Sequence, residues 1–201
     1  MAITKIILGS QSPRRRELMA GIMSGFSIPY SCISIEADES YPSDLKGAAV
    51  ASYIAEQKAI AYENQLASGE LLITADTIVC LGDEILGKPS SKEEAKAMLS
   101  KLSGRAHEVY TAVYFTWKTT TNSLIRKHLV DATTVQFNSL SNSSIEHYVE
   151  EYQPLDKAGA YGVQEWIGYI GIKHISGSYY NVMGFPTDLV YQWLVENLCS
   201  M

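Results

Sequence analysis

The sequence is short of several features that mark specialised classes of protein. Its 201 residues include three cysteines, Cys32, Cys80 and Cys199, which are far apart and follow no metal-binding spacing. We therefore predict reduced structural thiols, and neither a disulfide framework nor a zinc site. The sequence also has no apolar run long enough to cross a bilayer, and its opening Met-Ala-Ile-Thr-Lys lacks the layout of a signal peptide. These absences predict a cytoplasmic protein that does not bind a membrane.

Basic residues are also few: 16 lysines and arginines stand against 22 acidic residues, and the net charge is −6. Because nucleic acids and membrane surfaces are bound by extended basic surfaces, we expect no nucleic-acid partner. A small polyanion remains compatible with this charge if a few cations converge locally and a divalent metal neutralises the rest. Linkers, low-complexity tracts and internal repeats are absent as well, so the sequence predicts a single domain over residues 1–201.

What the sequence does contain is a succession of apolar strand patterns and helix patterns, with 46% hydrophobic and 19% charged residues overall. This composition is typical of a folded protein with room for one sizeable core or two small lobes around a cleft. We expect strands over residues 3–8, 28–35, 71–75, 78–81, 109–117, 124–137 and 169–175. We expect helices from residue 13 to about 21–25 and over 42–66, 91–102, 141–152 and 186–197, with a loop over 177–184.

The segment over residues 10–17 breaks a local rule in a way that points to an anion. Ser12 followed by Pro13 predicts the start of a helix directly after an apolar strand. The first turn of a helix favours acidic residues, yet residues 14–16 are all arginine. A strand, a small-residue loop and a helix N-terminus aim backbone N–H groups at a phosphate, and arginines add charge-assisted hydrogen bonds. The alternative is that the arginines form a solvated face.

Asp76 interrupts the apolar run over residues 71–81 and is the first candidate for a chemical role. Aspartate is depleted in strands and costly to bury alone, so Asp76 needs a counter-charge or a metal as partner. The alternative is an aspartate that caps a turn. Residues 82–83, Gly-Asp, predict a hairpin turn that carries Lys88 back towards Asp76.

Four further positions have both a functional and a structural interpretation. Residues 36–40 carry three carboxylates after a strand, which fits either a metal-facing loop or a solvated turn. Lys58 lies in a predicted helix, where a lysine is usually a surface charge. Gln164 follows small residues, and its amide either reads a base edge or sugar or belongs to an ordinary loop. His107 has no second histidine one helical turn later, so we predict a structural role for it.

Five blocks of the sequence, taken together and in this order, resemble one known family. They are SQSPRRREL (residues 10–18), ADTIV (75–79), GKP (87–89), LSGRAHEVYT (102–111) and DKAGAYGVQ (156–164). Each block is moderately specific, and together they span nearly the whole chain. The chain resembles the Maf family of nucleoside triphosphate pyrophosphatases.

The resemblance implies an α/β fold in which an elongated mixed β-sheet is flanked by helices, with two lobes around a cleft, related to the inosine triphosphatase fold. It implies hydrolysis of a nucleoside triphosphate between the α and β phosphates, giving the monophosphate and pyrophosphate. It further implies a divalent metal, Mg²⁺ or Mn²⁺, as cofactor, and a homodimer.

The resemblance also assigns roles to residues of this sequence. The aspartate that matches Asp76 is the proposed general base of the family. The positions associated with substrate choice match Arg14, Thr77 and Gln164. The positions that line the site match Ser10, Arg15, Glu39, Lys58 and Lys88. We expect the arginines and the two lysines to hold phosphate oxygens, and Glu39 and Asp76 to hold the metal.

The dipeptide Asp76-Thr77 is similar to the branch of the family that acts on dTTP and UTP. The branch that prefers 7-methyl-GTP tends to have Asp-Gln at this point, so Thr77 indicates the first branch. Two alternatives are a 7-methyl-GTP pyrophosphatase and a nucleotide-binding regulator of septum formation with little catalysis. The chain departs from the family pattern at residues 165–168, Glu-Trp-Ile-Gly, where we expect Trp166 to alter the nucleoside pocket.

Overall fold

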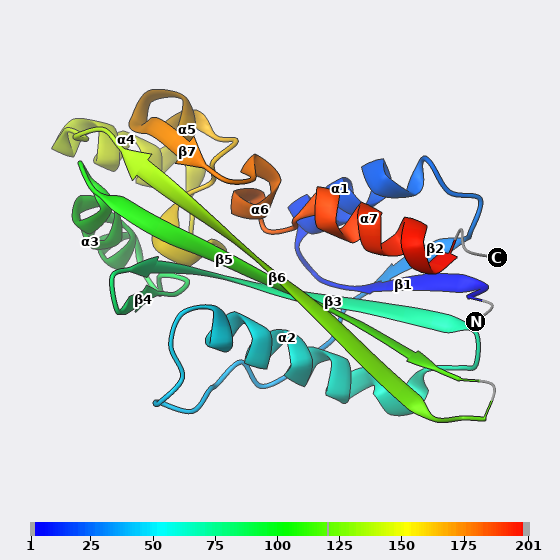
Figure 1. Cartoon of the computed structure of the whole chain (residues 1–201). Helices are drawn as coiled ribbons and strands as arrows, with labels where there is room; N and C mark the ends of the chain where they lie inside the picture. Colours follow the sequence, from blue (N-terminus) through cyan, green and yellow to red (C-terminus); the bar gives the residue numbers. More distant parts are fainter. Residues whose placement is uncertain (1–2, 120, 199–201) are drawn as a thin grey trace.

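A seven-stranded mixed β-sheet connects all parts of the protein (Figure 1). The computed structural model describes residues 3–119 and 121–198. The strands are β1 (Lys5–Gly9), β2 (Tyr30–Ile33), β3 (Glu70–Leu81), β4 (Glu84–Leu86), β5 (Ala106–Lys118), β6 (Leu124–Phe137) and β7 (Ile172–Ser176). Their order is β2-β1-β3-β5-β6-β7, and β4 pairs with β3 off this path. β1 is parallel to β2 and β3 while the other pairs are antiparallel, which confirms the predicted mixed sheet.

Helices cover both faces of this sheet at one end and gather at its other end (Figure 1). They are α1 (Pro13–Met23), α2 (Ala48–Tyr62), α3 (Lys92–Leu102), α4 (Asn142–Tyr152), α5 (Trp166–Gly171), α6 (Tyr179–Met183) and α7 (Thr187–Leu198), with 3₁₀ turns over Glu63–Gln65 and Ala158–Ala160. In the first lobe α2 packs on one face of the sheet and α1 and α7 pack on the other. In the second lobe α3 and α4 pack with the far ends of β5 and β6 around Phe137 and Tyr148. The predicted two-lobed α/β fold is confirmed.

Strand β3 changes its neighbour half-way along one edge. Its first half pairs with β1, and that register ends with Gly9 opposite Thr74. Its last residues pair with β4, beginning at Val79. Residues 75–78 therefore lie between two neighbours, while the opposite edge stays paired with β5 from Leu71 to Cys80. Such a change of neighbour leaves a crevice at the sheet, and in α/β proteins ligands bind at positions of this kind.

The prediction that β3 breaks at Asp76 was wrong. The strand is continuous because Asp76 pairs with Ala112 of β5 without interruption. The carboxylate itself leaves the sheet where β1 has already ended. The hairpin turn after β3 was predicted correctly and joins it to β4.

The helix predicted over residues 42–66 begins later and ends earlier than expected. Pro42 starts only a turn, in which its carbonyl accepts the N–H of Leu45 at 3.1 Å. Gly47 then takes a φ of +50°, a conformation open to glycine, and serves as the N-cap of α2. The strand predicted over residues 28–35 is likewise shorter, because only Tyr30–Ile33 pairs with β1.

The last third of the chain departs most from its prediction. A strand was predicted over residues 169–175, but α5 occupies the first half of this range and β7 begins only at Ile172. Gly168 permits this helix, because a Cβ there would lie 2.0 Å from the carbonyl oxygen of Val163. The predicted loop over residues 177–184 contains α6, whose N-cap Ser178 accepts the N–H of Asn181 at 3.3 Å.

The described part of the chain also bears on the thiols and on membranes. Cys32 and Cys80 are free thiols, as predicted, whereas Cys199 lies outside the described residues. Burial raises the pKa of Cys80 to about 11, which keeps its thiol protonated. Among residues 3–119 and 121–198, no helix combines the length and apolar character needed to cross a bilayer.

Candidate active site

A cleft of about 560 Å³ opens beside the change of neighbour on β3. Its walls come from the loop between β1 and α1, from α2 and β3, and from the segment between α4 and α5. Every site residue predicted from the sequence lines it, namely Ser10, Arg14, Arg15, Glu39, Lys58, Asp76, Thr77, Lys88 and Gln164. Residues up to 154 positions apart in the chain are thus brought to one cleft.

Asp76 and Thr77 point to opposite faces of the sheet, because side chains alternate along a strand. The face of Asp76 also carries Leu72, Ile78 and Cys80, which pack against α2. The face of Thr77 carries the residues that pack against α1 and α7, among them Ile73. The cleft therefore has access to both faces of β3 at this one dipeptide.

An ionic cluster surrounds Asp76 on the α2 face. Lys58 donates to Asp76 Oδ1 at 2.7 Å and lies 2.8 Å from Glu39 Oε1, so one ammonium joins two carboxylates. Lys88 reaches Glu39 Oε2 at 3.2 Å from the segment after β4. Burial on its own would raise the pKa of Glu39, but Lys58 and Lys88 outweigh it and lower that pKa. Both carboxylates are thus held next to cations in the cleft.

The position of Lys58 follows from the packing of α2 on β3. Thr74 donates its hydroxyl to the carbonyl of Ala55 at 2.8 Å. Lys58 lies one helical turn beyond Ala55, and Asp76 lies two residues beyond Thr74 on the same face of the strand. The lysine and the aspartate therefore meet, and the interpretation of Lys58 as an ordinary surface charge does not hold.

The segment over residues 36–40 contains the turn that one interpretation predicted, and it also directs the Glu39 carboxylate into the cleft. Asp38 behaves as a turn residue, because its carboxylate accepts the N–H of Ser40 at 2.9 Å and the Ser40 hydroxyl at 2.7 Å. Glu39 turns the other way, into the cleft and towards Lys58 and Lys88.

Arg15 occupies the opposite face of β3 and is only 9% exposed. Its Nη1 donates to the carbonyl of Ala75 at 3.0 Å and to Ser10 Oγ at 3.5 Å. Its Nε donates to the Gly184 carbonyl at 2.8 Å and its Nη2 to Thr77 Oγ1 at 3.1 Å. Four of the five N–H groups are thus engaged within the protein, and Arg15 satisfies the carbonyl left over where β3 changes neighbour. Burial lowers the pKa of Arg15, while the nearby Asp76 raises it, and a guanidinium stays charged under both influences.

Helix α1 begins as its sequence predicts and points its first turn at the cleft. Ser12 is the N-cap and accepts the N–H of Arg15 at 3.4 Å, with Pro13 at the first helical position. Arg16 folds back and donates to the Ser10 carbonyl at 2.8 Å. Arg14 instead reaches across the cleft to Asp156 Oδ2 at 3.0 Å, a residue 142 positions away. The three arginines thus have three different tasks.

The segment between α4 and α5 supplies the second wall of the cleft. Gln164 lies in it, and its side-chain Oε1 is buried with no hydrogen-bond partner among the described residues. Asp156 and Lys157 also line this wall, although sequence reasoning gave them no role. They are the first two residues of the block DKAGAYGVQ, and this block was the sequence signal that could have indicated them as site residues. Gly184 was missed too, because its role depends on the tertiary hydrogen bonds that its carbonyl accepts from Arg15 and Thr77.

Trp166 and His107 have structural roles. Trp166 was expected to alter the nucleoside pocket, but it begins α5 and packs its ring on His147 at 4.8 Å, outside the residues that line the cleft. The expectation was wrong because the chain turns into a helix directly after Glu165. His107 is buried and hydrogen-bonds the Tyr161 hydroxyl at 2.7 Å, and burial lowers its pKa to about 4. The predicted structural role of His107 is confirmed.

Comparison with known proteins decides the family. Residues 5–197 match the family described as Maf-like protein. The chain belongs to the Maf family. A Maf relative from Bacteroides thetaiotaomicron, named dTTP/UTP pyrophosphatase, is 52% identical over 188 residues, which is 93% of each chain. A relative of the same name from Flavobacterium psychrophilum is 44% identical over 194 residues, covering 96% of this chain and 95% of the relative.

The Maf chain also shares its fold with a solved structure of lower identity. The Ham1 protein of Staphylococcus aureus superposes with a TM-score of 0.54, covering 96% of this chain and 98% of that one, at 16% sequence identity. At this identity the likeness concerns the fold alone. The resemblance to the Maf family drawn from the five sequence blocks is confirmed by the match over residues 5–197.

The donor set of this Maf cleft fits a divalent metal that is bound together with a substrate. Within the described ranges, no three His, Cys, Asp or Glu side chains are grouped so as to hold a metal by themselves. Mg²⁺ in nucleotide sites is usually held by one or two carboxylates together with substrate phosphates. Glu39 and Asp76, joined through Lys58, provide two carboxylates of this kind.

The charges along the cleft also favour a metal that is bound together with the substrate. Five cationic side chains line it, Arg14, Arg15, Lys58, Lys88 and Lys157. Four carboxylates line it as well, Glu36, Glu39, Asp76 and Asp156. Because these charges nearly cancel, a polyphosphate would meet little net positive charge without an added cation.

Proposed function

We propose that this Maf chain is a nucleoside triphosphate pyrophosphatase that hydrolyses dTTP and UTP to the monophosphate and pyrophosphate. The observation that carries the proposal is the cleft itself, in which Asp76, with the ammonium of Lys58 between it and Glu39, lies beside the N-terminus of an arginine-bearing helix. Relatives named dTTP/UTP pyrophosphatase at 44–52% identity support the choice of substrates.

The loop between β1 and α1, together with α2 and β3, forms the first wall of the cleft. We assign phosphate binding to this wall. The N-terminus of α1 presents backbone N–H groups, and Ser10 holds the preceding loop by accepting the N–H of Ser12 at 3.2 Å. Arg14, Lys58 and Lys88 supply cations for the phosphate oxygens. Arg15 contributes its charge and its one remaining Nη2 N–H from a fixed position.

Proton transfer falls to Asp76. Hydrolysis at the α phosphorus needs a water molecule that loses a proton as it attacks, and a carboxylate in the cleft accepts it. Lys58 Nζ lies 2.7 Å from Asp76 Oδ1, so this carboxylate has a counter-charge beside it in the cleft. Glu39 and Asp76 would hold Mg²⁺ or Mn²⁺, which supplies charge neutralisation for the pyrophosphate leaving group.

Base recognition falls to Gln164 and Thr77. Thymine and uracil share an imide edge with one N–H between two carbonyls, and a glutamine amide both donates and accepts hydrogen bonds. Gln164 lines the cleft, and its Oε1 has no hydrogen-bond partner among the described residues, so this acceptor is not committed to another protein group. Thr77 lies 2.9 Å from the Thr111 hydroxyl and within reach of Arg15, which fixes its orientation in the cleft.

Pyrophosphate release from a panel of nucleotides tests this function. We expect release from dTTP and UTP with Mg²⁺ or Mn²⁺, and much less from CTP, GTP and 7-methyl-GTP. Preference for 7-methyl-GTP would refute the substrate assignment. Tight binding of all nucleotides with no release would instead favour a nucleotide-binding regulator of septum formation.

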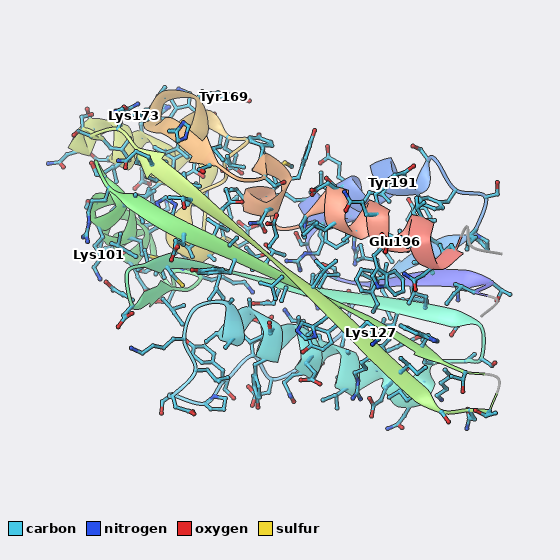
Figure 2. The ribbon with its side chains drawn as sticks, viewed as in Figure 1. Lys101, Lys127, Tyr169, Lys173, Tyr191 and Glu196 are labelled. Atoms are coloured by element: carbon cyan, nitrogen blue, oxygen red, sulfur yellow. The ribbon has the colours of Figure 1, made fainter. Side chains whose placement is uncertain are left out.

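We extend the proposal to the oligomeric state of the protein and to its location in the cell. We place the enzyme in the cytoplasm, where nucleoside triphosphates are available, and infer a homodimer from the family resemblance. Tyr169, Tyr179, Tyr180 and Tyr191 are exposed aromatic side chains, and Figure 2 shows Tyr169 and Tyr191 on the surface. A second copy would cover some of this surface. Light scattering should give twice the chain mass of 22.2 kDa.

A further inference from the structure

The carboxylate of Asp156 lies between two cations from different parts of the chain. Its Oδ2 accepts from Arg14 Nη1 at 3.0 Å, and its Oδ1 accepts from Lys157 Nζ at 2.7 Å. Arg14 belongs to the first turn of α1, whereas Lys157 belongs to the segment after α4. All three residues line the cleft. Two cations from opposite walls therefore converge on one position that an anion occupies.

The anion at this position is exposed, while one of the cations is fixed. The Asp156 side chain is 57% exposed and the Lys157 side chain only 8%. A partly exposed ion pair contributes little free energy, so the aspartate can turn to solvent at small cost. The pKa of Asp156 would be raised by burial alone, but Lys157 and Arg14 lower it, so the position favours a negative charge.

Lys157 keeps a second counter-ion when Asp156 leaves. Its Nζ lies 3.2 Å from Glu165 Oε1. The other oxygen of Glu165 accepts from the hydroxyl of Tyr148, which is fully buried and also accepts the N–H of Gly162 at 3.0 Å. Buried ion pairs are weak sources of stability, so this network is better explained by the position it gives to Lys157.

We propose that Arg14 and Lys157 form a phosphate subsite across the cleft, which Asp156 fills until a polyphosphate displaces it. Glu165 is the positioning residue for Lys157, and Tyr148 holds Glu165. The subsite rests on the proposed function only for the nucleotide as natural ligand, because the chemistry that it recognises is a polyphosphate chain. This role extends phosphate binding to the second wall, beyond the residues assigned above.

Binding of inorganic tripolyphosphate, measured by calorimetry at low salt, tests the subsite without catalysis. Lys157→Met should weaken binding about tenfold or more, since it removes a charge-assisted hydrogen bond to phosphate. Lys157→Arg keeps the charge and should restore most of the affinity. Glu165→Gln still accepts from Tyr148 but no longer holds the ammonium, so it should weaken binding several-fold. Thermal unfolding of each variant verifies that it is folded.

Asp156→Asn gives the decisive second variant, because an exposed side chain can be changed without endangering the fold. It should bind tripolyphosphate about threefold or more tightly, since the competing carboxylate is gone. Lys173→Met serves as the matched control. Lys173 is exposed on β7 away from the cleft (Figure 2), so the same loss of charge there should change the affinity by less than about twofold.

Two results would overturn the subsite. One is an Asp156→Asn variant that binds tripolyphosphate no more tightly than the unmodified protein. The other is a folded Lys157→Met variant that binds no more weakly than Lys173→Met. These results are independent of turnover: a protein that shows the expected shifts but releases no pyrophosphate from dTTP would refute the proposed function and leave the subsite standing.

Discussion

The two faces of β3 meet the cleft in opposite ways at adjacent residues. On the α2 face, Asp76 and Glu39 share the ammonium of Lys58; Asp76 is 9% exposed, as little as Arg15, whereas the side chain of Glu39 is 45% exposed. On the opposite face, Thr77 lies beside the buried guanidinium of Arg15, whose partners are neutral oxygens. One face is an ionic cluster and the other is a neutral frame around a single buried charge.

The two faces of the strand therefore differ in how readily their contacts can be exchanged for contacts to a ligand. The Glu39–Lys88 pair joins side chains that are 45% and 57% exposed, and such pairs contribute little each and are readily exchanged for bonds to a ligand. A buried guanidinium that has lost its water needs its protein acceptors, and those acceptors need it. We therefore place the chemistry on the face of Asp76 and the preorganised support on the face of Arg15.

The largest expected effect comes from the ionic face. Asp76→Asn should lower the rate of pyrophosphate release about 10³-fold, because it removes the proton acceptor at nearly constant shape. Nucleotide affinity should change much less. The matched control is Asp83→Asn in the exposed turn after β3, which should retain full activity. A rate for Asp76→Asn close to that of the control would remove Asp76 from the mechanism.

The second effect comes from the neutral frame and concerns stability. Arg15→Met should lower the free energy of unfolding by about 3 kcal/mol, because the carbonyl of Ala75 loses its Arg15 donor and the carbonyl of Gly184 keeps only the Thr77 hydroxyl at 3.4 Å. Chemical denaturation measures this difference. Arg14→Met is the control and should stay within about 0.5 kcal/mol. If Arg15→Met unfolds like the unmodified protein and loses only substrate affinity, the contrast between the two faces is wrong.

The neighbouring arginine should show the opposite pattern. Arg14→Ala should raise the KM for dTTP about tenfold, since it removes a charged phosphate donor, while its stability is preserved. Steady-state kinetics beside thermal unfolding separate the two quantities. Unchanged kinetic constants would exclude Arg14 from the phosphate site and weaken the case for the subsite with Lys157.

The smallest effect is a pH dependence that belongs to the ionic face. Lys58 and Lys88 lower the pKa of Glu39 despite its burial, so the folded state holds the carboxylate more strongly than the unfolded chain does. Its contribution is complete above the unfolded pKa and is lost as the pH falls through the lowered one. Because Glu39 is partly exposed, we expect only about 0.5 kcal/mol. Glu39→Gln should reduce the acid sensitivity of unfolding by this amount, and an unchanged slope would argue against the pairing.

Local sequence signals located residues that lie on both faces of β3. They did not show that one face is an ionic cluster and the other a neutral frame around a buried charge. Ser12 and Pro13 located the start of α1, and Asp76 stood out because an aspartate is unusual in an apolar strand. The burial of Arg15 could not be predicted, since its partners include Ala75 and Gly184, which lie 60 and 169 residues further along the chain. Adjacent arginines look alike in a sequence until tertiary contacts separate them.

The errors in the predicted secondary structure also arise from tertiary contacts that the sequence does not show. The start of α2 depends on the positive φ of Gly47, and α5 depends on the close packing of Gly168 against Val163. Neither is visible in a pattern of apolar residues, which predicted a longer helix and a strand instead. The misplaced Trp166 followed from the second error, because a residue at the start of a helix points elsewhere than one in a loop.

Product analysis of dTTP hydrolysis in ¹⁸O-labelled water shows which phosphorus atom the water attacks. The proposed function places the attacking water at the α phosphorus, beside Asp76. We therefore expect dTMP and pyrophosphate as products, with the ¹⁸O label in dTMP alone, as read by ³¹P NMR and mass spectrometry. Formation of dTDP and phosphate, or a label in the pyrophosphate, would refute attack at the α phosphorus and with it the proposed function.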